Sequence, residues 1–160
     1  MAGCGLAAGI LKRTVKMKVT INVAKLQPNA TLPRYAHSGL FGDLAADLYS
    51  AEAATLAAGE TRAVATGLAF EFPAEFGALV QDRSGLALKG ISTLAGVIDP
   101  GYRGELKVVI TNLSSQQFEI STGDRIAQLR IVRRIEAEFT ESESLTETQR
   151  NARGFGSTGK

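Results

Sequence analysis

Short segments in which apolar and polar residues alternate constrain the fold of this chain more than any other feature. Every second residue from Val15 to Val23 is apolar. Successive side chains of a strand point to opposite faces, so this pattern predicts a strand with one buried face. Residues 68–72, 105–111 and 126–132 have similar strand patterns, and turn residues separate them. Many short strands of this kind predict an antiparallel sandwich, jelly roll or barrel.

One segment does not fit the strand pattern. Leu44 to Ala58 is rich in alanine, and Gly59 follows it as a stop signal. Intrinsic propensity therefore predicts a helix here, although composition alone does not settle the question.

The 160 residues suit a single domain. We expect residues 14–140 to form its core. Residues 1–13 contain an apolar stretch that precedes Lys12 and Arg13, the reverse of the order in a signal peptide, so a disordered extension is expected there. Residues 141–160 are polar and lack apolar periodicity, so this tail is flexible unless something that it binds orders it.

Composition excludes several classes of site. One Cys and one His cannot build a zinc centre of about four ligands or an intrachain disulfide, and we expect a reducing, cytoplasmic compartment. The 18 basic and 16 acidic side chains nearly balance. No polybasic run points to a nucleic acid or a membrane, and no protein partner is evident.

Two short segments could bind or act on a phosphate compound. Arg83 and Ser84 precede a run of helix formers, and unpaired N–H groups at a helix start suit a phosphate. Asp99 lies between an apolar strand end and a turn that contains Tyr102, where a carboxylate can act as a general base. Taken singly, an ordinary helix cap and an ordinary turn explain these two segments better than a phosphate site does.

Two further segments are weaker signals when taken alone. Gln128 lies on the strand face opposite Ala127 and Leu129, where a polar amide is usually just solvated. The tail 150–159 combines Phe155 with glycines, hydroxyls and two arginines. Such a segment can close over a flat ring and a polyphosphate, or it can remain a disordered terminus.

Taken together and in this order, the segments resemble the five motifs of the trimeric deoxyuridine triphosphatase (dUTPase) family. The resemblance extends over residues 17–160, and its motifs are Ala46–Ala51, Arg83–Ala87, Gly96–Gly104, Gly123–Leu129 and Arg150–Gly159. It implies an all-β, single-domain, jelly-roll-like barrel. It also implies a homotrimer in which the swapped arm 141–160 closes over a neighbouring active site. On this pattern the residues around Asp47 form a strand rather than a helix.

The resemblance further implies the hydrolysis of dUTP to dUMP and diphosphate, assisted by Mg²⁺ carried on the triphosphate. The family roles transfer residue by residue to this chain. Asp99 is the expected general base, Gln128 the holder of water and phosphates, and Asp47 an outer-shell anchor for the metal. The remaining matches are the expected substrate contacts: Arg83, Ser84 and Gly85 for phosphates; Thr93, Gly96, Val97, Ile98 and Lys107 for uracil; Tyr102 for the deoxyribose; and Arg150, Phe155, Gly156, Ser157 and Thr158 in the arm.

The chain departs from the family pattern at several positions. Asp82 stands where the family often has proline, Thr93 where bacterial members often have asparagine, and Asn151 and Arg153 where the arm commonly has glycines. Two alternatives remain open. A related dCTP deaminase would need a glutamate at the position of Val109, and a non-catalytic nucleotide-binding β-trimer would have lost some of the motifs.

Overall fold

The structure is a computed structural model that describes residues 18–149 and 151–152. The expected N-terminal extension 1–13 and the first part of the predicted strand lie outside these residues. The same is true of five expected arm contacts: Arg150, Phe155, Gly156, Ser157 and Thr158.

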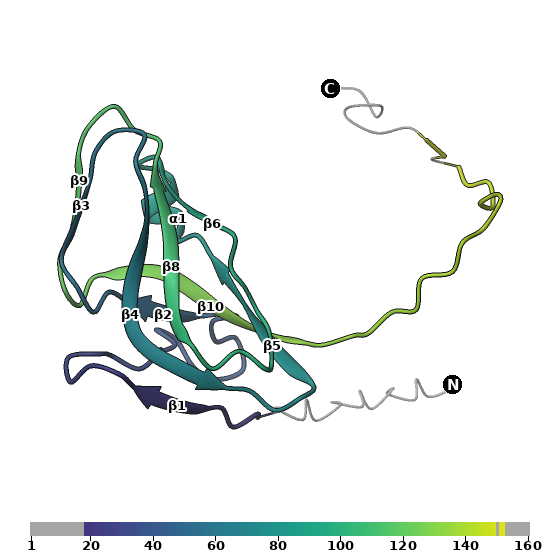
Figure 1. The fold of residues 1–160 in the computed structure, drawn as a ribbon, viewed down its shortest axis with the longest axis horizontal. Coiled ribbons are helices and arrows are strands. Elements are labelled where there is room, and N and C mark those ends of the chain that lie inside the picture. Colours follow the sequence, from purple (N-terminus) through teal and green to yellow (C-terminus); the bar gives the residue numbers. More distant parts are fainter. Residues whose placement is uncertain (1–17, 150, 153–160) are drawn as a thin grey trace, which may run out of the picture.

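The regular secondary structure of the described chain is almost entirely β, which confirms the all-β prediction (Figure 1). One short helix, α1 (Ser84–Ala87), interrupts the strands. The strands in chain order are β1 (Asn22–Lys25), β2 (Ala46–Tyr49), β3 (Ala54–Leu56), β4 (Thr61–Glu71), β5 (Phe76–Gln81), β6 (Ile91–Leu94), β7 (Val97–Ile98), β8 (Glu105–Asn112), β9 (Phe118–Ile120) and β10 (Arg125–Arg133).

The strands form two four-stranded sheets and one two-stranded ribbon. The sheet orders are β1-β4-β8-β6 and β2-β10-β5-β7, the ribbon pairs β3 with β9, and every pair is antiparallel. Leu68 of β4, Ile110 of β8, Leu48 of β2 and Leu129 of β10 belong to one buried cluster. Because these residues come from both large sheets, the sheets enclose a shared core.

Alternation along the strands determines which face meets this core. In β8, Leu106, Val108 and Ile110 are buried, whereas Lys107 between them is exposed. In β10, Ala127 and Leu129 are buried on either side of the half-buried Gln128. The period of two read from the sequence therefore predicts the inward face correctly in both strands.

Two sequence expectations need correction. The segment 44–58 contains β2 and β3 rather than the helix that alanine propensity favours, as the family pattern requires. The buried side chain of Leu48 and pairing with β10 outweigh the small intrinsic preference of alanine for helix. The first strand begins at Asn22 among the described residues, so Val19 and Ile21 precede the paired segment.

After β10 the chain leaves the sheets, and residues 134–149 extend away from them without forming a strand (Figure 1). Ile135, Phe139 and Leu145 in this segment are 86%, 94% and 89% exposed. Within the residues that the structure describes, no helix is long and apolar enough to cross a membrane.

Candidate active site

A cleft of about 480 Å³ lies between the β7 turn and β8. Five residues predicted from the sequence line it, together with Glu105 and Leu106. They are Val97, Ile98, Asp99, Tyr102 and Lys107. The structure therefore brings three of the expected uracil contacts, the expected deoxyribose contact and the expected general base into one cleft, as a nucleotide site requires.

The backbone of the β7 hairpin is fixed against β5. Gly96 has a φ of +108°, and a Cβ at this position would lie 2.8 Å from the Val80 carbonyl oxygen. The Val80 N–H donates a hydrogen bond of 2.8 Å to the Gly96 carbonyl, and Ile98 pairs with Ala78. Only glycine allows this close approach, so the hairpin presents a rigid main chain to the cleft.

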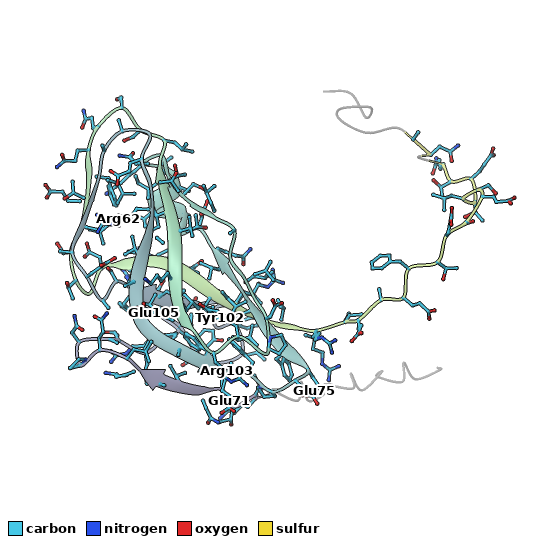
Figure 2. All side chains as sticks on the ribbon, in the orientation of Figure 1. Arg62, Glu71, Glu75, Tyr102, Arg103 and Glu105 are labelled. Atoms are coloured by element: carbon cyan, nitrogen blue, oxygen red, sulfur yellow. The ribbon has the colours of Figure 1, made fainter. Side chains whose placement is uncertain are left out.

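A tight turn connects Asp99, the expected general base, with Tyr102, the expected deoxyribose contact. The Tyr102 N–H donates to the Asp99 carbonyl at 3.1 Å, and the Tyr102 hydroxyl donates to the Glu105 carbonyl at 3.0 Å. Arg103 stabilises the turn, because its Nη1 donates a hydrogen bond of 2.7 Å to the Pro100 carbonyl. Figure 2 shows Tyr102 near Arg103 and Glu105.

Asp99 and Tyr102 are both accessible from solvent. The tyrosine is 47% exposed, and Asp99 also belongs to the exposed class. Among the described residues, no hydrogen bond or ion pair occupies the Asp99 carboxylate. A carboxylate in this position can accept a proton from water in the cleft.

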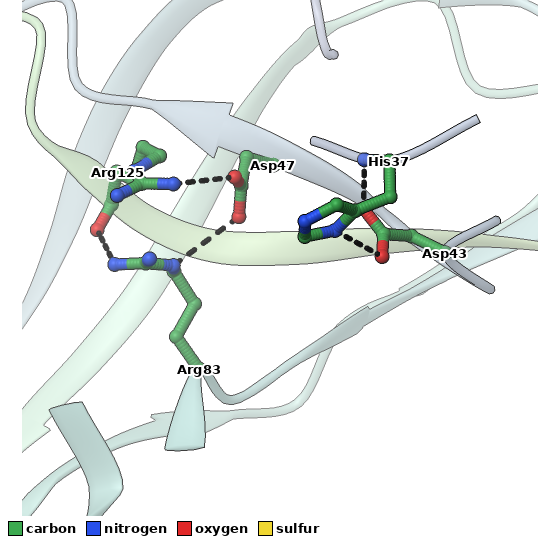
Figure 3. A network of polar contacts seen from close by, with 5 residues as sticks. All are labelled: His37, Asp43, Asp47, Arg83 and Arg125. Atoms are coloured by element: carbon green, nitrogen blue, oxygen red, sulfur yellow. Dashed lines mark hydrogen bonds and ion pairs between the residues drawn. The ribbon is translucent and has the colours of Figure 1, made fainter. Parts of the chain in front are cut away.

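A second group of predicted residues forms an ion-pair network at β2, β10 and the end of β5 (Figure 3). Asp47 is 6% exposed and lies between two arginines. Its Oδ1 accepts from Arg83 Nε at 3.2 Å and its Oδ2 from Arg125 Nη1 at 3.2 Å. Arg83 Nη1 also donates to the Arg125 carbonyl at 3.0 Å. These contacts fix the Arg83 guanidinium beside the α1 turn.

Sheet pairing explains how this network forms. In the register of β2 with β10, Gln128 lies opposite Asp47, and in the register of β10 with β5 it lies opposite Gln81. Ser84 and Gly85 follow Arg83 at the start of α1, which no side chain caps. The structure thus brings together the residues expected from motifs one, two and four.

Two contacts were missed in the sequence. The sequence places Arg125 inside the motif Gly123–Leu129 but gives no indication of its partner. Only the pairing of β2 with β10 reveals that it reaches Asp47, 78 positions away. Thr93 lies in β6, is absent from the cleft lining, and its hydroxyl donates to Asp82 at 2.6 Å.

A nearby exposed pair, His37 and Asp43, serves as a comparison. The His37 N–H donates to Asp43 at 2.7 Å, and the imidazole Nδ1 lies 3.1 Å from the same carboxylate. The backbone hydrogen bond from His37, followed by its side chain, lowers the pKa of Asp43 below its ordinary value. Figure 3 shows this pair beside the Asp47 network but not joined to it.

The two groups of predicted residues are separate within one chain. The cleft lining contains none of Asp47, Arg83, Ser84 and Gln128. In the orientation shared by Figures 1 and 2, α1 and Tyr102 also lie apart. The two groups therefore occupy different places on one chain.

Comparisons with known protein sequences and with solved structures agree on one family. A sequence model of dUTPase matches residues 29–159, most of the chain. The chain belongs to the dUTPase family. The deoxyuridine 5'-triphosphate nucleotidohydrolase of Solibacter usitatus is 44% identical over 146 residues, which are 89% of this chain and 98% of that protein. The enzyme of the same name from Wolinella succinogenes is also 44% identical, over 89% of this chain and 96% of its own length.

Solved dUTPase structures share the architecture. The dUTPase of Staphylococcus bacteriophage 80alpha with dUpNHpp matches with a TM-score of 0.79 and 28% identity, over 88% of this chain and 98% of that chain. A mutant dUTPase from phage phi11 of S. aureus, described with a structural Mg(II) ion, matches with a TM-score of 0.72 and 26% identity, over 80% and 99% of the two chains.

Proposed function

We propose that this protein hydrolyses dUTP to dUMP and diphosphate. The observation that carries the proposal is the cleft that joins Asp99, Tyr102 and the β7 hairpin in a chain of the dUTPase family. Its relatives are named for this reaction, and the phage 80alpha structure holds dUpNHpp. The activity supplies dUMP for thymidylate synthesis and keeps uracil out of DNA.

Asp99 is the general base of the proposed mechanism. Its exposed carboxylate takes a proton from a water molecule, whose oxygen attacks the α-phosphorus while the bond to the diphosphate oxygen breaks. Gln128 helps to hold the water and the phosphates. Positioning and charge neutralisation supply most of the rate enhancement in phosphoryl transfer.

The cleft distinguishes dUTP from related nucleotides by shape. Main-chain groups of Gly96, Val97 and Ile98 are proposed to pair with the uracil edge, and Val97, Ile98 and Lys107 line the cleft. The Tyr102 ring lies under the deoxyribose and leaves no room for a 2′-hydroxyl. Its hydrogen bond to the Glu105 carbonyl supports this role by limiting how far the ring can move.

The phosphate contacts come from the other half of the site. Arg83 is oriented by Asp47, and Ser84 and Gly85 begin the adjacent helix. Forked guanidinium donors match phosphate oxygens well. In the arm, Arg150, Ser157 and Thr158 are proposed to contact the γ-phosphate, and Phe155 with Gly156 to cover the uracil.

The donor set fits an Mg²⁺ ion that arrives with the triphosphate. Among the described residues, no cluster of three His, Cys, Asp or Glu side chains could hold a metal. Mg²⁺ keeps several waters and often binds through substrate phosphates. Both Asp47 oxygens already accept from arginines, so Asp47 would reach the ion through a water. When bound, Mg²⁺ neutralises charge on the phosphates.

A homotrimer accounts for the two separated halves. The cleft of one chain would meet the Arg83 turn of a second chain, and the arm 141–160 of a third would close over both. The exposed Ile135 and Phe139 support this arrangement, because a segment with such apolar side chains is stabilised when another subunit covers them. We also propose a cytoplasmic location, in keeping with the single cysteine.

Mixing two inactive variants tests the shared site. Asp99→Asn and Arg83→Ala each remove one half of the site, so each homotrimer should lose diphosphate release from dUTP. Refolding the two variants together should restore activity, because some sites then combine an intact Asp99 with an intact Arg83 from another chain. No recovery in verified mixed trimers would contradict a site shared between chains.

A further inference from the structure

Asp82 places a carboxylate directly beside the proposed phosphate turn. A negative charge there would repel a triphosphate unless other groups bound the carboxylate and offset its charge. The structure shows how the charge is engaged. Asp82 Oδ1 accepts from the Thr93 N–H at 2.5 Å and from the Thr93 hydroxyl at 2.6 Å, and its Oδ2 accepts from the Ser92 hydroxyl at 2.9 Å.

These three donors all belong to β6, so Asp82 ties the end of β5 to that strand. Burial acts to raise the pKa of Asp82, but the hydrogen bonds from Thr93 and Ser92 outweigh it and hold the pKa below its ordinary value. The carboxylate is therefore ionised at neutral pH. Hydrogen bonds to an ionised acceptor are among the stronger ones in proteins.

The phosphate turn is consequently anchored on two sides. On one side Arg83 binds Asp47 of β2 and the Arg125 carbonyl of β10. On the other side the preceding residue, Asp82, binds β6. Ser84 follows as the first residue of α1, a helix that has no side-chain capping bond at its N-cap, Arg83.

The uracil-reading hairpin has separate anchors. Gly96 and Ile98 are fixed by β5 through the Val80 N–H and the pairing with Ala78. Neither contact involves Asp82. Loosening the Asp82 contacts should therefore affect the phosphate turn and leave the base-binding hairpin in place.

We propose that Asp82 is a positioning residue for triphosphate binding, acting through Thr93 and Ser92 to fix the angle at which Arg83 and Ser84 face the substrate. The proposal rests on the proposed function. In place of the uracil contact that the family pattern implies, it gives Thr93 a role as the partner of Asp82, in keeping with the absence of Thr93 from the cleft lining. The Asp82 carboxylate beside the phosphate site then has a structural role, because it accepts its hydrogen bonds from Ser92 and Thr93 of β6.

The test compares a ligand with phosphates and a ligand without them. Thr93→Val removes one hydroxyl donor and leaves the Asp82 charge unchanged, and Asp82→Asn removes the charge. We expect each variant to bind dUpNHpp about tenfold more weakly than the wild type, whereas deoxyuridine binds equally well to all. The double variant should lose less than the sum of the two single losses, because both changes act on the contact between Asp82 and Thr93.

Three outcomes would overturn this role. If Asp82 merely repels phosphate, Asp82→Asn will bind dUpNHpp more tightly. If the contact only stabilises the fold, both ligands will bind more weakly together. Unchanged binding of both ligands by folded variants would also refute it. Ser92→Ala with Thr93→Val is the second test should Asp82→Asn fail to fold. A wild-type protein that binds neither ligand would instead refute the proposed function.

Discussion

Replacing Asp47 with asparagine should destabilise the fold even when no Mg²⁺ is present. Asp47 is 6% exposed, and its carboxylate accepts one hydrogen bond from each of Arg83 and Arg125, both at 3.2 Å. Asparagine keeps one acceptor but turns an N–H₂ group toward a guanidinium. The change therefore leaves two arginines facing a buried, uncharged side chain.

The magnitude follows from the burial of the three side chains. Removing one partner of a fully buried ion pair costs about 3–5 kcal/mol. The arginine side chains are 24% and 49% exposed, so water can replace part of what is lost. We therefore expect a loss of about 2 kcal/mol in the free energy of unfolding, below the fully buried case.

Urea unfolding at a fixed chain concentration, with EDTA present, measures this loss. Asp43→Asn is the matched control, because Asp43 is an acid in an exposed pair with His37 alone, and it should unfold close to the wild type. A loss for Asp47→Asn below about 0.5 kcal/mol would refute the reasoning. So would a loss that appears only when Mg²⁺ is added, since the two arginine contacts would then contribute nothing to the stability of the fold.

Other predictions address the cleft, the arm and the phosphate turn. Tyr102→Ala should admit UTP, and an unchanged ratio of kcat/KM for dUTP and UTP would place sugar selection elsewhere. Deleting residues 150–160 should abolish most turnover while a sizing column still gives a trimer; a monomer would contradict the lid role. Gly96→Ala should destabilise the fold by about 2–3 kcal/mol through its strained φ and its contact with Val80, and an unchanged thermal melt would argue against this. Because the pKa of Asp82 is lowered, its carboxylate stabilises the fold above about pH 4 and loses this effect at lower pH. The difference in the free energy of unfolding between the wild type and Asp82→Asn should therefore shrink in acid. A difference that stays constant with pH would contradict a stabilising role of the ionised carboxylate.

Much of the fold follows from local pattern. Strands β8 and β10 were predicted because alternation places Val108 and Leu129 on a buried face wherever the partner sheet lies. The segment 44–58 is different, since the helix preference of alanine is weak and its conformation depends on pairing with strands far along the chain. Propensity alone therefore favours the wrong structure there.

In the candidate site, too, some residues could be placed from local sequence and others only from the pairing of distant strands. Asp99 and Tyr102 lie in one turn, so a short motif was enough to place them together. The Asp47–Arg125 pair depends on the register of distant strands, and so a local motif could not reveal it. The use of Asp82 as an anchor was equally hidden, because a carboxylate beside an arginine gives no indication of β6.

The products formed from four nucleotides test the central claim most directly. Diphosphate and ammonia would be measured after incubation with dUTP, UTP, dCTP and dTTP, each with and without Mg²⁺. The account predicts diphosphate from dUTP in the presence of Mg²⁺, little from the other three, and loss of this release in Asp99→Asn. Ammonia from dCTP would instead show a deaminase, and binding of dUTP without release of diphosphate would show a non-catalytic protein.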